Sequence, residues 1–241
     1  MISVYLVLII SALTTLKCNQ SKIDTNNNIV RQSYPLNDNV TFNHIVVNSF
    51  INYQLIQDDI NSVEIETHKS VHNCCIHVEV TQKHILLINL NRTVHNYPKI
   101  NAYIKFKSLK QLDAIGTGHV QSMTIIKQQQ DKFILNKQGT GNVNLILEVN
   151  KLQAFISGTG HVKLNGHVRI EARIRQSGTT TLDARHCLMN KISIISNGVT
   201  SAHIVGKNEI NISVDGISNV YYRGPLNKQK KSNFLAKIQP F

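Results

Sequence analysis

The sequence Gly116-Thr-Gly-His-Val120 returns twice further along the chain, as Gly139-Thr-Gly-Asn-Val143 and as Gly158-Thr-Gly-His-Val162. When the first glycine of each turn is placed in register, three later turns join the series, which gives Gly116, Gly139, Gly158, Gly178, Gly198 and Gly216. Successive glycines are 23, 19, 20, 20 and 18 residues apart. A period near 20 residues with a recurring turn is typical of a solenoid, in which each repeat forms one rung.

The residues on both sides of these glycines follow a period of two. At the positions four and six residues before and after them, 22 of 24 residues are apolar, and Lys110 and Ser122 are the exceptions. Side chains two residues apart lie on one face of a strand. One rung cannot bury that face alone, whereas stacked rungs bury it against one another. We therefore predict an all-β fold, a β-solenoid with rungs of roughly 20 residues and with glycine at the corners.

The part of the chain before the repeat is also rich in strand signals. Alternating apolar and polar residues, or a short apolar run, predict strands at 42–47, 63–67, 76–80 and 85–90. Residues 58–59 and 68–73 are candidate turns. After the N-terminal apolar run, no segment has a sustained 3.6-residue apolar period with capping residues, so we expect almost no helix. We place this strand-rich part and the repeat in one domain, residues 40–226.

The N-terminus carries an uncharged apolar run at residues 2–16, which is short for a membrane span and suits an export signal. We predict an export signal at 1–18 rather than a buried or membrane-retained helix. Cys18 is a candidate for lipidation, although Thr-Leu-Lys before it departs from the small residues expected there, and simple cleavage nearby is the alternative. The polar residues 19–39 are predicted to form a tether.

These N-terminal features predict export to the periplasm, the outer membrane or the cell surface. Membrane contact is expected only through the signal or a lipid anchor. Three further cysteines, Cys74, Cys75 and Cys187, lack the Cys-x-x-Cys spacing of a zinc site. We expect buried, unreactive thiols, and the sequence leaves open a disulfide to Cys187.

The charge balance is strongly basic, because 26 Lys and Arg residues face 14 Asp and Glu residues and give a net charge of +12. Such an excess attracts polyanions in general. Residues 227–241 form a predicted basic tail, which could touch anionic lipid or polysaccharide, although a solvated end is the simpler interpretation. Basic residues are not interleaved with aromatic ones, which argues against specific nucleic-acid recognition. The candidate partners are therefore an anionic polysaccharide or lipopolysaccharide.

A column of polar residues follows the glycine corners at the third position after each one. We define it as the surface ladder: His119, Asn142, His161, Thr181, Ser201 and Asn219. The ladder should project outward, either as solvated or cross-rung hydrogen-bonding residues, or as a metal or anion site on the two histidines. Those histidines are two rungs apart, roughly 9–10 Å, and the asparagine between them is a poor zinc ligand. We predict no metal site and no cofactor.

The sequence offers no catalytic constellation that we can identify. The Gly-x-Gly turn lacks the third glycine of a dinucleotide fingerprint, and its recurrence favours a structural role. We expect the acidic residues after Gly116 not to share one column, which leaves a glycosidase pair unsupported: Glu148, Glu171, Asp183, Glu209 and Asp215. A Ser-His-Asp or Cys-His set stays open, but no flanking motif indicates one. We predict that the protein is not an enzyme.

The order of these features resembles the family named "putative auto-transporter adhesin, head GIN domain", which is found in bacterial envelope proteins. The resemblance lies in Leu109-x-x-Leu112-x-Ala-x-Gly-Thr-Gly-His-Val120, in the repeated Gly-x-Gly turns and in Asp215-Gly-Ile-Ser-Asn-Val-Tyr-Tyr-Arg-Gly224, and covers roughly residues 40–226. It implies a right-handed β-helix of pectin-lyase-like shape, no recognised catalytic set and a role in adhesion. Family members often carry Asp directly after the Gly-x-Gly, where this chain has His or Asn.

Three functions follow from these observations. The first is an exported, non-enzymatic β-solenoid of the bacterial cell envelope that acts in adhesion or in surface or matrix interaction. The second is a polyanion- or polysaccharide-binding module, which could coexist with the first. The third, a pectin-lyase-like carbohydrate-active enzyme, rests on the fold type alone. The sequence leaves open the ligand and the oligomeric state.

Overall fold

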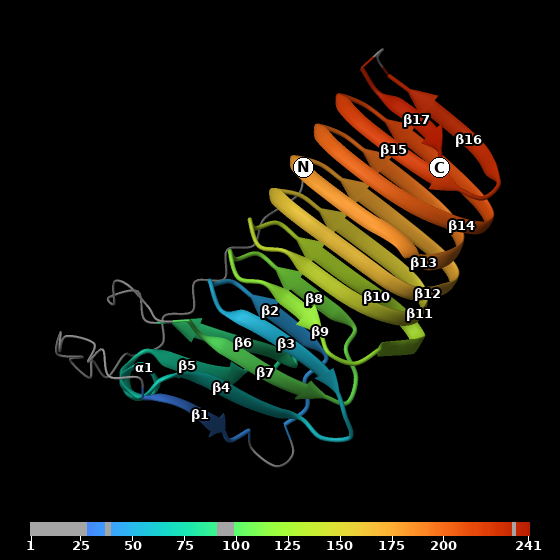
Figure 1. The fold of residues 1–241 in the computed structure, drawn as a ribbon. Helices are drawn as coiled ribbons and strands as arrows, with labels where there is room; N and C mark the ends of the chain where they lie inside the picture. Colours follow the sequence, from blue (N-terminus) through green and yellow to red (C-terminus); the bar gives the residue numbers. More distant parts are fainter. Residues whose placement is uncertain (1–27, 37–39, 91–98, 233–234) are drawn as a thin grey trace.

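The computed structural model describes residues 28–36, 40–90, 99–232 and 235–241 of the chain. These residues form strands and one short helix (Figure 1). The elements before the long repeat strands are β1 (Ile29–Tyr34), β2 (His44–Val47), β3 (Asn52–Gln57), β4 (Ser62–His68), α1 (Lys69–Cys74), β5 (Ile76–Val80), β6 (Ile85–Leu90), β7 (Asn101–Phe106), β8 (Gln111–Ala114) and β9 (Val120–Ser122). The later ones are β10 (Ile126–Lys137), β11 (Val143–Ile156), β12 (Thr159–Gln176), β13 (Thr179–Ser196), β14 (Val199–Val214), β15 (Ile217–Arg223), β16 (Leu226–Lys231) and β17 (Lys237–Pro240).

Each rung crosses one wall of the solenoid, turns at a corner and continues along a second wall. The first wall is a parallel stack of β6, β2, β8 and β10, continued by the second halves of β11 to β14 and by β16. The second wall stacks β7, β3 and β9, then the first halves of β11 to β14, then β15 and β17. The stacked rungs are visible along the rod in Figure 1. The predicted all-β solenoid is confirmed.

The core is a set of vertical columns of inward side chains. One column stands in register over five rungs, and each of its members is at most 2% exposed: Val143, Val162, Leu182, Ala202 and Val220. Of the 24 flanking positions singled out in the sequence, Lys110 is exposed and Tyr222 half-buried, and the others are buried. Burial of apolar surface contributes about 25 cal/mol per Å², so these columns are the main favourable term in the stability of the fold.

Glycine is required at the corners because the backbones of successive rungs approach one another too closely for a side chain. A Cβ atom added at Gly139 would lie 1.7 Å from the carbonyl oxygen of Gly116. At Gly158 it would lie 2.1 Å from the carbonyl oxygen of Gln138, and Gly158 also has a φ of +81°. The corner becomes tighter here, since β12 begins at the residue after Gly158, whereas β11 begins four residues after Gly139.

Inside the corners, several rungs carry polar rather than apolar side chains. Lys137 is 1% exposed, and its Nζ donates to the carbonyl oxygens of Gly139 (2.6 Å) and Thr159. Burial lowers the pKa of Lys137. Nearer the C-terminus, the buried hydroxyls of Ser196, Thr200 and Ser218 form a hydrogen-bonded chain. Buried polar groups are costly unless they are paired. The Lys137 bonds connect the Gly139 corner to the Gly158 corner, and the Thr200–Ser218 bond connects the Gly198 corner to the Gly216 corner.

The N-terminal strands belong to the same stack, but their order in space differs from their order in the chain. The β2–β3 rung lies between the β6–β7 rung and the β8–β9 rung. Beyond the β6–β7 rung the pairing becomes antiparallel, with β5 on β6, β4 on β7 and β1 on β4. This end of the rod is therefore closed by strands that do not continue the parallel repeat.

Three boundaries differ from the sequence-based expectations. The candidate turn at 68–73 is mostly the helix α1, whose first turn is capped by His68, with Nδ1 2.8 Å from the Ser70 hydroxyl oxygen. The predicted tether contains β1, which pairs with β4 and so extends the domain toward the N-terminus. The predicted basic tail contains β16 and β17, which pair with β14 and β15 and add a further rung. The export signal and Cys18 lie outside the described residues.

The Gly158→Ala variant tests the corner geometry. Because the new methyl group would meet the backbone of the preceding rung in a left-handed conformation, we expect a loss of about 2–4 kcal/mol in the free energy of unfolding. Urea unfolding followed by circular dichroism measures it. The neighbouring Thr159→Ala variant removes an exposed side chain and should cost less than about 1 kcal/mol. Equal losses in the two variants would contradict the assignment of Gly158 as a steric corner.

Candidate functional site

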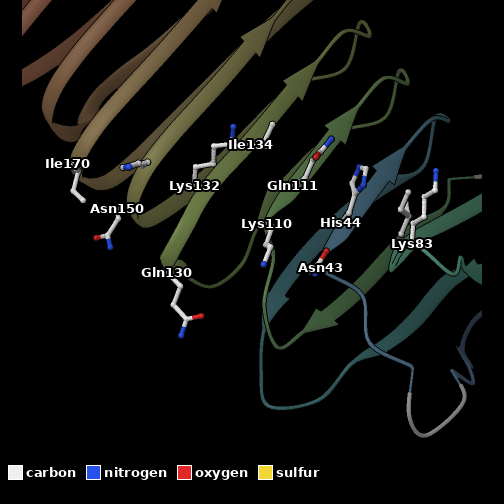
Figure 2. Close-up of a pocket in the computed structure, with 12 residues that line it drawn as sticks. Asn43, His44, Lys83, Lys110, Gln111, Gln130, Lys132, Ile134, Asn150 and Ile170 are labelled. Carbon is white, nitrogen blue, oxygen red and sulfur yellow. The ribbon is translucent and has the colours of Figure 1, made fainter. Parts of the chain in front are cut away.

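A groove of about 790 Å³ runs across the first wall at the starts of its strands, on the side opposite the glycine corners (Figure 2). We call it the lysine groove and define it by its lining residues: Asn43, His44, Lys83, Ile85, Lys110, Gln111, Gln130, Lys132, Ile134, Asn150, Lys151 and Ile170. The volume is within the range of small-ligand sites. The lining residues come from β2, the β5–β6 turn, β6, β8, β10, β11 and β12 or lie directly beside them.

The groove exists because the rungs change shape at this corner. The pairing registers of β10, β11 and β12 with their neighbours shift at 128–132, 149–151 and 168–172. Such bulges add residues that stand out from the wall, and Gln130, Asn150 and Ile170 lie in these three segments. On the neighbouring rung Leu109 is buried and Lys110 exposed. The groove is therefore bounded by bulged rungs on one side and by β2 and β6 on the other.

Four lysines give the groove its charge, and none of its twelve lining residues is acidic. Lys83, Lys110, Lys132 and Lys151 are all exposed. Lys132 and Lys151 are direct neighbours on adjacent strands, and the Nζ of Lys132 donates to Gln153 Oε1 at 3.0 Å. Like charges at this spacing repel one another, and they attract anions from solution.

The turn that carries Lys83 is fixed to the neighbouring rung. His84 has a left-handed backbone (φ 58°), and its Nδ1 lies 2.8 Å from the carbonyl oxygen of Thr41. The backbone N–H of Lys110 donates to the carbonyl oxygen of Asn43 at 2.7 Å. Hydrogen bonds to backbone carbonyl oxygens thus position the attachment points of both lysines, while their long side chains keep rotamer freedom.

Beside the groove, His44 and Asp113 form a partly buried pair across neighbouring rungs, with His44 Nε2 2.7 Å from Asp113 Oδ2. The other carboxylate oxygen accepts from Gln111 at 2.9 Å and from Asn136 at 2.6 Å. Burial raises the pKa of Asp113, but the hydrogen bonds from His44 and the two amides outweigh it, so the pKa lies below the usual value. Asp113 is fully engaged with protein groups, which is typical of a structural carboxylate.

The surface ladder lines up along the second wall as the sequence spacing predicts. The first two members of the ladder each accept a hydrogen bond from a backbone N–H of the next rung. His119 Nδ1 accepts from the Asn142 N–H at 3.2 Å, and Asn142 Oδ1 accepts from the His161 N–H at 2.9 Å. Thr181, Ser201 and Asn219 continue the column in register. These contacts fit the cross-rung hydrogen-bonding interpretation rather than an ion site.

Three of the acidic residues of the repeat are paired with cations, and one expectation about the acids was wrong. Glu171 and Glu209 do share a column, because both lie seven residues before a corner glycine. Lys191 stands beside Glu209 with its Nζ 3.5 Å from Oε2, while Glu171 binds Arg173 at 2.7 Å. Arg185 binds Asp183, and mainly this hydrogen bond lowers the pKa of Asp183 to about 2. These acids form exposed ion pairs, and they do not converge on a common point.

The remaining candidates do not form a second site. Cys187 and Cys75 are buried without a disulfide, and burial raises the pKa of Cys187 to about 12, which makes it an unreactive thiol. Within the described part of the chain, no three His, Cys, Asp or Glu side chains are close enough to hold a metal ion. No helix among the described residues is long and apolar enough to cross a membrane.

Sequence reasoning missed the lysine groove, because its residues come from strands that are far apart in the chain. One signal was visible. Lys110 is the only charged residue among the 24 otherwise nearly apolar flanking positions, and it lies where the groove opens.

Comparison with known proteins places this geometry among related solenoids. The profile of the family described as "Putative auto-transporter adhesin, head GIN domain" matches residues 41–225. A solved structure of a putative adhesin from Bacteroides fragilis has a TM-score of 0.80 at 20% identity, covering 89% of this chain and 98% of that one. One described as a putative lipid binding protein, from Parabacteroides distasonis, has a TM-score of 0.72 at 14% identity, covering 90% and 98%. These identities show a shared fold. No curated protein matches the sequence.

The Asp113→Asn variant tests the role of the buried carboxylate. The folded pKa lies below the unfolded value of about 3.9, so its stabilising contribution is complete above that value and is lost as the pH falls through the folded pKa. We expect the variant to unfold about 1–3 kcal/mol more easily at pH 7, and this difference should shrink toward pH 2. Urea unfolding at several pH values measures it. Asp59→Asn, at an exposed site, serves as the control, and a pH-independent difference would contradict the assignment.

Proposed function

The chain belongs to the family of the "Putative auto-transporter adhesin, head GIN domain", and from this membership we propose that it is an exported, non-enzymatic protein of the bacterial cell envelope that acts in adhesion, by binding a surface or matrix ligand. The observation that carries the proposal is that the rung architecture accounts for the repeated glycines, the buried columns and the surface ladder. The feature that this architecture does not explain is an exposed groove. We find no converging catalytic groups among the described residues.

The polar groups near the groove support binding rather than catalysis. Asp113 is held by three hydrogen-bond donors, and three acids of the later rungs, Glu171, Asp183 and Glu209, are paired with Arg or Lys. Sugar cleavage by hydrolysis requires two carboxyl groups that flank one bond. The pectin-lyase-like alternative keeps only its fold-type support.

Export is part of the proposal and rests on the sequence. The apolar run at 2–16 supports an export signal, and Cys18 supports a lipid anchor at the mature N-terminus. An adhesion role requires a location at the cell surface or in the envelope, which the family description also suggests.

Cell fractionation and an attachment assay test this proposal. We expect the protein in the envelope fraction, and mass analysis of its mature N-terminus should show either a lipidated Cys18 or cleavage close to it. Cells that lack the protein should attach less to a surface or matrix. The complete chain should restore attachment, whereas the matched chain without residues 1–18 should not. A cytoplasmic location, or unchanged attachment in the deletion strain, would overturn the proposal.

A second candidate function is binding of a polyanion, such as an anionic polysaccharide or lipopolysaccharide. The +12 charge and the acid-free lining of the lysine groove favour it. The description of one structural neighbour as a lipid binding protein is compatible with a lipopolysaccharide ligand. If charge drives binding, the affinity should fall steeply between low and physiological salt. This function can operate together with adhesion.

A further inference from the structure

We propose that the lysine groove binds a linear acidic polysaccharide lengthwise, with the glycan chain running along the solenoid axis and its carboxylates against the lysine row. This inference rests on the second candidate function and adds the site, the ligand class and the orientation of the chain.

The lysines are arranged as a row because they belong to an ordered stack of strands. The parallel order on the first wall is β6, β2, β8, β10 and β11. Lys83 precedes β6, Lys110 precedes β8, and Lys132 and Lys151 lie on β10 and β11. Four strand spacings of about 4.8 Å make the row about 19 Å long. A strand spacing is close to the length that one pyranose adds to an extended glycan, so charges on successive sugars can follow successive rungs.

The other lining residues fit a sugar better than a bare anion. Amide groups of Asn43, Gln111, Gln130 and Asn150 can both donate to and accept from hydroxyl groups. Three isoleucines offer apolar surface for the C–H faces of sugar rings, and Ile170 is 45% exposed at the ridge. Figure 2 shows these side chains on neighbouring strands along the same wall.

The same lining argues against the other polyanions. None of the twelve residues is Phe, Tyr or Trp, whereas proteins that bind single-stranded nucleic acid stack several bases on such rings. Only three of its twelve lining residues, the isoleucines, have apolar side chains, whereas a pocket that buries a lipid chain is lined mostly by apolar side chains. A chain of carboxylated sugars uses the lysines, the amides and the isoleucines together.

The test compares two variants with the same change in net charge. The groove variant replaces Lys83, Lys110, Lys132 and Lys151 with Gln. The control variant replaces Lys207, Lys228, Lys230 and Lys231, which are exposed on or beside β14 and β16, in the same way. All eight side chains are exposed, so both variants should fold, and thermal unfolding verifies this.

Binding of the purified full-length protein is measured by calorimetry with hexagalacturonate, galacturonic acid, a neutral dextran oligomer and polyphosphate. We expect hexagalacturonate to bind much more tightly than the single sugar or the dextran. Since the groove variant removes four exposed charge contacts, each of which contributes only modestly to binding, it should lose about 10- to 100-fold in affinity. The control variant should lose less than about threefold. Ile170→Ser should weaken hexagalacturonate binding and leave polyphosphate binding unchanged.

Each of the following results would overturn one stated part of this inference. Equal losses in the two lysine variants would show diffuse attraction, which removes the groove but keeps polyanion binding. Binding of polyphosphate that is as tight as binding of hexagalacturonate, with no effect of Ile170→Ser, would remove the sugar assignment. Absence of hexagalacturonate binding to the unmodified protein would overturn the inference outright, while the proposed adhesion function would still be decided by its own attachment assay.

Discussion

The structure depends on how closely one rung can approach the next at the glycine corners. At Gly116, Gly139 and Gly158, the space that a Cβ atom would occupy is already taken by a backbone carbonyl of the preceding rung. With hydrogen at that position, the strands on both walls reach hydrogen-bonding distance in the same register over many rungs. The apolar columns can then stack vertically, and a rung that is unable to bury its own apolar face gains a neighbour on each side.

The candidate site is built where this regularity is interrupted. The glycine side of the rod is nearly uniform, but the opposite side contains three successive bulges and a rung on which Lys110 points outward. The rigid stack fixes the position of each strand, and the bulges place residues that stand out from the surface of the wall. A groove of this kind takes its spacing from the sheet, because each lysine is carried by a different rung. The uniform side contributes to stability, and the irregular side presents basic, amide and apolar side chains next to one another.

The repeat could be predicted from the sequence because its signals are local. The corner glycine, the apolar residues at even-numbered offsets and the ladder residue all lie within one rung, so the sequence alone predicts which residues share a column. The swapped position of the β2–β3 rung could not be predicted, because nothing in 44–57 indicates that the later strands β6 and β7 pair with it. The last rung is interpreted as a tail from the sequence because β16 contains three lysines and only one apolar residue, so it lacks the alternating apolar pattern of a strand. The groove was missed for the related reason that its twelve lining residues lie on or beside six strands, each of which contributes only one to three of them.

The strands at the two ends of the rod also affect whether copies of the protein can join end to end. A stack of parallel strands can be extended by further copies of the chain, because the backbone N–H and C=O groups of its final strand are unpaired and can bond to a strand of another copy. Here the first end finishes in antiparallel strands of β1, β4 and β5, and the last carries Lys228, Lys230 and Lys231, exposed on β16. Like charges would meet if two such lysine-rich ends joined, and the first end no longer continues the parallel repeat. Both features oppose end-to-end growth of the stacked strands into a fibre.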